Sequence, residues 1–295
     1  MNRRENIMAF LFVAPACALI LIFVLWPVVN TFATSMFQVG LTDTKYGPYC
    51  GVANYRALFD DPAFRRSAAN TAVFTVAVVP VQTFLALLFA LWTNSPAWSR
   101  RTLRVSVFLP TVLSLTVLSV LWRLLYEPAS LSGTGLFNGI LAALHLPTQP
   151  FLTSPHQALW AIVIMSVWQG AGLQMMIFLA ALQQIPDERY EAARIDGAGR
   201  WQQFRHVTLP AIAPTAMFVV MVTTIFALKL FVQPFIMTRG GPEGSTMSVV
   251  QYIYESAFFA RDLGLACAAG GVFFVAVCLI AVALRGLMRV VEARQ

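Results

Sequence analysis

The sequence predicts an all-α, polytopic membrane protein with about six transmembrane helices. Of its 295 residues, 58% are hydrophobic and only 11% are charged, whereas soluble domains carry about 25% charged residues. The apolar residues also form long runs that alternate with short charged stretches, which is the pattern that a lipid bilayer imposes. We expect these runs to form one transmembrane domain over residues 1–295.

Each run must hold about 20 apolar residues to cross a bilayer as a helix. The runs that meet this requirement lie at residues 7–32, 70–92, 105–125, 158–182, 212–237 and 263–288. Several contain proline, which membrane helices tolerate because neighbouring groups satisfy the freed backbone carbonyl. The first run is too long for a cleaved signal peptide, so we expect it to persist as a span.

Basic residues are unevenly distributed among the segments between the predicted spans. If the N-terminus is inside, the inner segments 1–6, 93–104, 183–211 and 289–295 hold most of the arginines, while the outer loop 126–157 holds none. The positive-inside rule therefore predicts that both termini are cytoplasmic. The same distribution accounts for the net charge of +7. We expect no nucleic-acid partner, because no basic cluster with interleaved aromatic residues is present.

The inner segment 183–211 has the most distinctive local pattern. Pro186 cannot continue the preceding helix, and Asp187 can cap a new one. The residues from Glu188 to Ile195 then suit a short helix. This first part of the segment predicts a helix that lies outside the bilayer, between the fourth and fifth spans.

Two glycines interrupt that helix. Gly197 and Gly199 provide the conformational freedom that a turn at a helix end needs. A second short helix, Trp201–Val207, is expected to end at Leu209-Pro210. The segment thus predicts a helix–turn–helix across the cytoplasmic face. On composition alone, an amphipathic linker resting on the inner leaflet explains it equally well.

Three groups of residues in this segment recur at a characteristic spacing: Glu191-Ala192-Ala193, Asp196-Gly197-Ala198-Gly199 and Leu209-Pro210. The spacing resembles the EAA motif of the permease subunits of ABC importers, with Gly197 as the motif glycine. The resemblance implies a type I importer fold, in which this loop is a coupling helix that docks in a cleft of a separate ATPase subunit. It assigns this coupling to Glu191, Ala192, Ala193, Asp196, Gly197, Gly199, Leu209 and Pro210.

Two outer segments narrow the resemblance to one branch of these permeases. Gly51–Tyr55 and the GGPEGST stretch within Thr238–Thr246 are similar to the carbohydrate and glycerol-3-phosphate type, although Val232 stands where an acidic residue is common. The resemblance implies import of a sugar or sugar-like solute. It also implies a bacterial or archaeal cytoplasmic membrane, a second homologous permease subunit, two ATP-binding subunits that hold ATP and Mg, and an extracytoplasmic solute-binding protein.

Five polar or aromatic residues lie inside predicted spans and are candidates for the substrate pathway. The fourth span holds Trp168, Gln169 and Gln174, and the fifth holds Lys229 and Gln233. Polar groups within a bilayer are costly and usually face a cavity. A tryptophan can stack on a sugar ring, and glutamine amides match hydroxyls. The alternatives are that the glutamines bond across helices and that Lys229 extends toward the membrane surface.

A membrane-embedded enzyme and an ion-coupled secondary transporter are the alternative functions. An enzyme would need titratable or metal-binding residues at one depth, but the histidines His145, His156 and His206 are scattered over loops, and the four cysteines lack metal-ligand spacing. Ion coupling would call for buried acidic residues. We therefore expect no catalytic residue, no metal and no cofactor in this chain.

Overall fold

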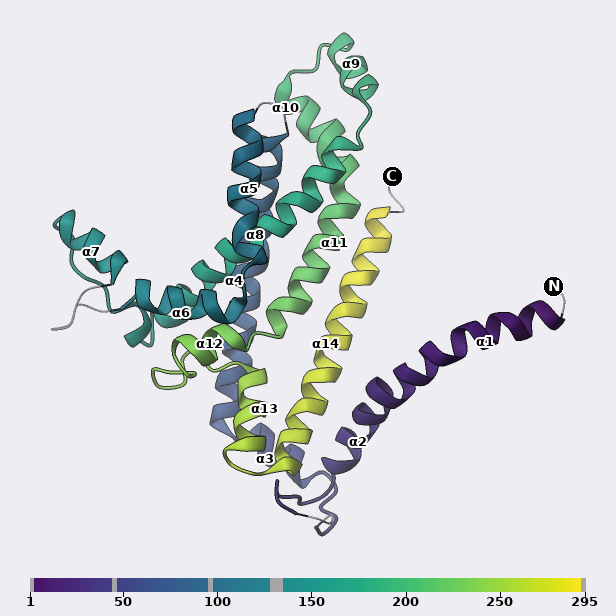
Figure 1. Ribbon diagram of the computed structural model, residues 1–295, viewed down its shortest axis with the longest axis vertical. Helices are drawn as coiled ribbons and strands as arrows, with labels where there is room; N and C mark the ends of the chain where they lie inside the picture. The colour runs from purple at the N-terminus through teal and green to yellow at the C-terminus, as the bar shows by residue number, and fades with distance from the viewer. Residues whose placement is uncertain (1–2, 44–46, 95–97, 128–134, 293–295) are drawn as a thin grey trace. The chain divides into compact units, whose positions relative to one another are not determined.

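The computed structural model describes residues 3–43, 47–94, 98–127 and 135–292. These ranges are mostly helical and contain no β-strand, apart from two isolated bridges (Figure 1). The helices in chain order are α1 (Arg3–Ile20), α2 (Trp26–Thr34), α3 (Ala53–Asp60), α4 (Pro62–Thr93), α5 (Trp98–Val112), α6 (Leu115–Leu125), α7 (Leu136–Ala143), α8 (Ala158–Gln183), α9 (Asp187–Ile195), α10 (Arg200–Gln203), α11 (Leu209–Leu228), α12 (Val232–Met237), α13 (Val249–Phe258) and α14 (Leu263–Glu292).

Within the described residues, five helical segments are long and apolar enough to cross a membrane. They are Phe12–Thr34, Pro62–Thr93, Ala158–Gln183, Arg200–Met237 and Leu263–Arg289. A sixth is present if the bent pair Arg100–Val112 and Leu115–Leu125 counts as one span. The prediction of an all-α membrane protein with about six spans is therefore confirmed.

The third predicted span, 105–125, is not one continuous helix. It divides into α5 and α6, which meet at 101°. Ser114 has the non-helical backbone angles φ −58° and ψ 128°, and it starts α6. Pro110 lies one turn earlier and cannot donate a backbone hydrogen bond to the preceding turn. The helix is therefore weakened just before the chain turns at Leu113 and Ser114.

The fifth predicted span also differs from expectation. The second helix of the inner segment does not end at Leu209-Pro210, because a π-helical turn at Phe204–Thr208 connects α10 to α11 without a break. A proline ring clashes with the carbonyl four residues before it in a regular helix. The wider π turn precedes Pro210 and accommodates its ring, so the helix enters the span directly.

The chain divides into two compact units: one comprises Met1–Arg65 and Tyr252–Ala276, the other Arg66–Gln251 and Val277–Gln295. This division leaves the expectation of one transmembrane domain as a prediction. In the first unit, the Asn54 side-chain amide donates to the backbone carbonyls of Ser35 and Phe37, at 2.8 and 3.0 Å. Tyr55 and Ser35 share a hydroxyl hydrogen bond of 2.7 Å. These bonds attach α3 to the end of the first span.

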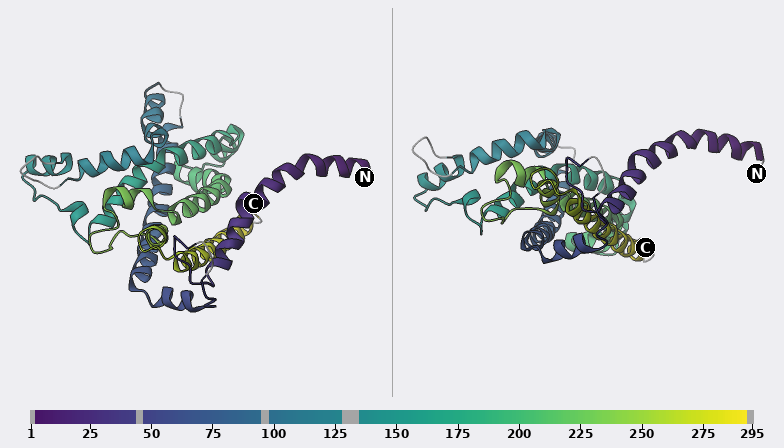
Figure 2. Two further views of the ribbon diagram at one scale, coloured as in Figure 1. Left: turned by 60° about the horizontal axis from the view of Figure 1, so that its bottom comes forward. Right: turned by 90° about the horizontal axis from the view of Figure 1, so that it is seen from below.

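Helix α8 is the centre of the second unit. Its buried residues belong to two hydrophobic clusters, one shared with α4 and α6 and the other with α4 and α11. The course of the α8 ribbon can be followed in Figures 1 and 2. Helix α8 also packs closely against α5 at Gly172, where an added Cβ would lie 2.3 Å from the carbonyl oxygen of Val107. Gly172 thus permits close helix packing, while α8 itself is unbroken.

Candidate functional site

The predicted inner helix is present as α9, Asp187–Ile195. Its N-cap is Pro186, in extended conformation, and no side chain caps the helix, so the expectation that Asp187 is the cap is wrong. Asp187 and Glu188 instead occupy the first turn. Their negative charge there is favourable because it lies at the positive end of the helix dipole.

A Schellman-type turn centred on Gly197 ends α9. The Ala198 N–H donates to the Ala193 carbonyl at 2.8 Å, and the Gly197 N–H donates to the Arg194 carbonyl at 3.0 Å. Gly197 has φ +78°, a conformation that favours glycine. Gly199 has φ −69° and is the N-cap of α10. Of the two predicted glycines, Gly197 alone therefore makes the left-handed turn.

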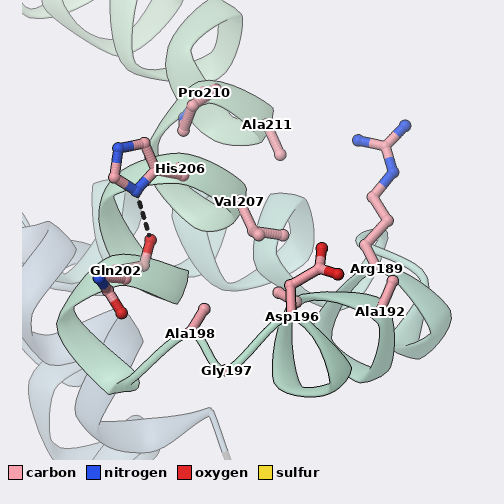
Figure 3. A pocket seen from close by; sticks show the side chains of 11 residues that line it. Arg189, Ala192, Asp196, Gly197, Ala198, Gln202, His206, Val207, Pro210 and Ala211 are labelled. Atoms are coloured by element: carbon pink, nitrogen blue, oxygen red, sulfur yellow. Dashed lines mark hydrogen bonds between the residues drawn. The ribbon is translucent and has the colours of Figure 1, made fainter.

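Side-chain hydrogen bonds join this turn to the start of the fifth span. The Gln203 side-chain amide donates to the Ala198 carbonyl at 2.8 Å, and the Tyr190 and Thr208 hydroxyls are 3.0 Å apart. The His206 Nδ1 lies 3.0 Å from the Gln202 carbonyl (Figure 3). These bonds connect α9, α10 and the π turn. Since the π turn runs directly into α11, the segment is held to the start of α11.

Within the segment 183–211, which is expected to couple to an ATPase, residues 187–211 surround an open groove of about 900 Å³ (Figure 3). We call residues 187–211 the coupling loop after this expectation. The lining residues are Arg189, Ala192, Ala193, Asp196, Gly197, Ala198, Gln202, His206, Val207, Pro210 and Ala211. Five predicted coupling residues thus lie together on one surface. Glu191, Gly199 and Leu209 are exposed but are not among those lining the groove.

The coupling loop also exposes two large apolar side chains that the sequence analysis did not single out. Ile195 is 86% exposed at the end of α9, and Trp201 is exposed at the start of α10. Their signal in the sequence is an apolar residue within a charged, non-spanning segment. Both side chains are accessible to a partner at this surface.

A second site is a cavity of about 360 Å³ between α4, α5, α8 and α11 in the second unit. It brings together four of the predicted pathway residues, Gln169, Gln174, Lys229 and Gln233. The other lining residues are Phe74, Val78, Gln82, Thr111, Leu115, Ser166, Gly170, Leu173, Ile177, Phe218, Val219, Val222, Thr223, Phe226, Ala227, Leu230, Phe231 and Val232. Trp168 does not line it. Trp168 packs instead on Trp122, with ring centroids 5.3 Å apart.

Gln174 is the most informative group in this cavity. Its side-chain amide donates to the Thr223 hydroxyl, while its Oε1 is buried and has no hydrogen-bond partner in the structure. A buried carbonyl that makes no hydrogen bond costs about 1–3 kcal/mol. The Gln233 amide lies 3.5 Å from the Ser166 hydroxyl, which is a long and weak contact. The cavity therefore offers amide groups whose hydrogen-bonding capacity is not fully used.

The wall of the cavity includes a break in the fifth span. Lys229 ends α11 with ψ 19°, Phe231 has φ −147°, and α12 begins at Val232. The Ser248 hydroxyl donates to the Leu230 carbonyl, which the break has freed from the helix. Broken helices next to a cavity are typical of substrate sites in transporters. Lys229 is exposed, and among the described residues it is the one charged residue in the lining.

Comparison with known proteins identifies the family. The profile of the binding-protein-dependent transport system inner membrane component matches residues 63–294. The chain belongs to this family. This inner membrane component is a multi-pass membrane protein, and the resemblance to ABC-importer permeases is confirmed. The matched region contains the whole coupling loop and every residue that lines the cavity.

Relatives of the inner membrane component include several transport permeases. It is 34% identical to the sulfoquinovosyl glycerol transport system permease protein SmoG of Agrobacterium fabrum, over 95% of this chain and 90% of the relative. It is also 34% identical to the lactose transport system permease protein LacF of Rhizobium radiobacter, over 96% of this chain and 93% of the relative. The trehalose/maltose transport system permease protein MalF of Thermococcus litoralis is 34% identical, over 83% of this chain and 82% of the relative.

The fold matches a solved structure over almost its full length. A bacterial ABC transporter involved in the import of the acidic polysaccharide alginate contains a chain that superposes with a TM-score of 0.83. The match covers 97% of this chain and 96% of that chain, at 23% sequence identity. The inner membrane component therefore has the type I importer fold.

Proposed function

We propose that this inner membrane component is the permease subunit of an ABC importer for a sugar or sugar-like solute, and that it forms half of the translocation pathway. The observation that carries the proposal is the cavity at Gln169, Gln174 and Gln233, in which the Gln174 carbonyl is buried without a partner. A sugar hydroxyl would supply the missing donor once the Gln174 side chain turns its carbonyl into the cavity. Relatives named for transport of sulfoquinovosyl glycerol, lactose and trehalose or maltose support the substrate class.

The lining of the cavity suits a sugar in two ways. Glutamine amides and the Ser166 and Thr111 hydroxyls provide both donors and acceptors, and the rings of Phe226 and Phe231 provide apolar faces for the C–H side of a sugar ring. Small-molecule sites have volumes of about 300–1,000 Å³, so about 360 Å³ is enough for one sugar unit. A longer solute would also contact the second homologous permease subunit.

The coupling loop is the proposed contact with the ATPase. Ala192, Ala193 and Gly197 have small side chains or none, so a partner can approach the groove closely. Ile195 and Trp201 supply exposed apolar contacts, and Glu191 supplies a charge for a basic residue of the partner. Since the loop continues into α11, which lines the cavity, a movement of the docked ATPase would reach the cavity through one helix.

The remaining partners follow from this assignment. Two ATP-binding subunits would hold ATP and Mg on the cytoplasmic side, where both termini of this chain would lie, and a solute-binding protein would deliver the substrate outside. A solved alginate transporter that was crystallised with a pentasaccharide-bound periplasmic protein supports the last of these. The membrane would be the cytoplasmic membrane of a bacterium or archaeon, and this chain would not be an enzyme.

No observation favours the two alternative functions. Among the described residues that line the cavity, none has a carboxylate that could couple transport to an ion. In the described part of the chain, no three metal-ligating side chains gather into a cluster. An ion-coupled secondary transporter and a membrane-embedded enzyme therefore gain no support from the cavity.

Reconstituted transport tests the proposal. The chain would be isolated in mild detergent with its co-purifying subunits and incorporated into liposomes with the solute-binding protein on the side opposite to ATP. We expect uptake of a labelled sugar that requires ATP and the binding protein. Uptake that persists without ATP but collapses when the ion gradients are removed would refute the ABC assignment. A complex that hydrolyses ATP but carries no member of a broad sugar panel would refute the substrate class.

A further inference from the structure

Helix α7 (Leu136–Ala143) is too short to span a membrane, yet it is firmly attached to the second unit. Asn138 is fully buried; its amide donates to the Gln149 carbonyl at 3.0 Å, and its carbonyl accepts from the Gln149 N–H at 2.8 Å. The Phe137 ring lies 5.6 Å from Trp122 and 4.9 Å from Tyr126 between centroids. One face of α7 is therefore fixed on α6.

A second face of α7 is apolar and exposed within the part of the chain that the structure describes. Leu136, Ile140 and Leu144 follow one another at intervals of four residues, and their exposed fractions are 56%, 48% and 63%. Residues at this spacing form a single stripe along a helix. The Leu146 N–H donates to the Leu141 carbonyl at 2.8 Å and closes a Schellman turn at His145, and the Leu146 side chain just beyond the helix is 51% exposed.

Two further features indicate what covers this stripe. The sequence from 128 to 157 contains no Asp, Glu, Lys or Arg, whose charges would be costly to place among lipids. The stripe also adjoins the exposed apolar surface of α6, at Val117, Leu121 and Leu124, and α6 packs against α7. Helix α6 belongs to a bent helix pair that is long and apolar enough to cross a membrane, which favours lipid as the neighbour of its exposed surface.

We propose that α7 lies in the membrane–water interface, with Leu136, Ile140 and Leu144 inserted among the lipids where the headgroups meet the acyl chains. An interfacial helix places its apolar face in this region and its polar face away from it. In α7 the buried Asn138 and the aromatic contacts take the place of the polar face. The stripe would thus hold the end of α6 at a fixed depth. This inference depends on the chain being a membrane protein and not on the substrate or on coupling to ATP.

Spin-label accessibility tests the proposal. Single cysteines would be introduced by Leu136→Cys, Ile140→Cys and Leu144→Cys in a background without the native cysteines. Labelled complexes that retain uptake would be placed in nanodiscs of phosphatidylethanolamine and phosphatidylglycerol. Reference labels would come from Val76→Cys, a 74% exposed position in the α4 span, and from Asp60→Cys, an exposed acidic position outside the spans.

We expect the α7 labels to collide with oxygen more often than the Asp60 label does and less often than the Val76 label does, and to collide severalfold less with a water-soluble nickel chelate than the Asp60 label does. Nickel collision rates equal to those at Asp60 would show that the stripe faces water and would overturn the proposal. Low collision rates with both reagents would show that protein covers the stripe, in particular a second subunit or the solute-binding protein, and would overturn it as well.

Discussion

Substitution of Gly197 tests the geometry of the coupling loop. Gly197 has φ +78°, and an added Cβ at this residue would meet no atom within 4 Å. The cost of Gly197→Ala is therefore due to the backbone alone, and an L-residue in the left-handed region costs about 1–2 kcal/mol. A free-energy cost of this size lowers the population of the correct turn by a factor of about 5 to 30. We expect ATP-driven uptake to fall by a factor within this range while the amount of protein in the membrane is unchanged.

Gly199 provides a matched control two residues away. It has φ −69°, and its added Cβ would lie 3.8 Å from the nearest atom, the Gln202 Oε1. Alanine adopts this backbone without strain, and its weaker preference for the N-cap position costs less than a strained left-handed turn, so Gly199→Ala should lower uptake much less than Gly197→Ala does. Gly197→Asn should recover much of the loss, because asparagine tolerates the left-handed conformation better than alanine.

The assay for these variants is the initial rate of sugar uptake and of ATP hydrolysis in the same proteoliposomes. We expect Gly197→Ala to lower the amount of sugar carried per ATP hydrolysed. We also expect less ATPase to co-purify with this variant. The reasoning would be refuted if Gly199→Ala were as damaging as Gly197→Ala. It would also be refuted if Gly197→Ala transported normally, since the turn would then not determine docking.

Three further substitutions have specific expected outcomes. Glu191→Lys should abolish uptake without changing the membrane level on an immunoblot; retained uptake would exclude a charge contact at this position. Gln174→Leu removes a buried carbonyl without a partner, so the melting temperature of the protein in detergent should stay the same or rise. The sugar concentration for half-maximal uptake should increase. Unchanged uptake kinetics would show that Gln174 only packs between helices. Gly172→Ala places a Cβ 2.3 Å from the Val107 carbonyl, and overpacking typically costs about 1–3 kcal/mol, so its melting temperature should fall; an unchanged value would show that α5 shifts freely.

The sequence was sufficient to place the spans, because a bilayer demands long apolar runs and those runs are visible directly. It was not sufficient to predict the bend between α5 and α6, since both arms are apolar and composition does not change at Ser114. The continuation of the helix through Pro210 was missed because proline usually marks a helix end, and the π turn that accommodates it depends on no obvious residue.

The same contrast applies to the cavity. Gln174 and Lys229 were predicted because an amide or an amine stands out in an apolar run. Ser166 and Thr223 were missed because small hydroxyls in spans commonly bond to the carbonyl one turn earlier, as both do here at 2.8 and 2.6 Å. Trp168 was grouped with the glutamines by proximity in sequence, but its ring packs on Trp122 instead of lining the cavity.

Crosslinking from the coupling loop tests whether this loop contacts the ATPase. A photoreactive amino acid would replace Ile195, which is 86% exposed at the end of α9, in the complex isolated with its co-purifying subunits. We predict a crosslinked product that contains an ATP-binding subunit. The yield of this product should change when ATP is added. If residue 195 crosslinked only to lipid, or to no nucleotide-binding protein, in a complex that still imports sugar with ATP, the coupling loop would not be the contact with the ATPase.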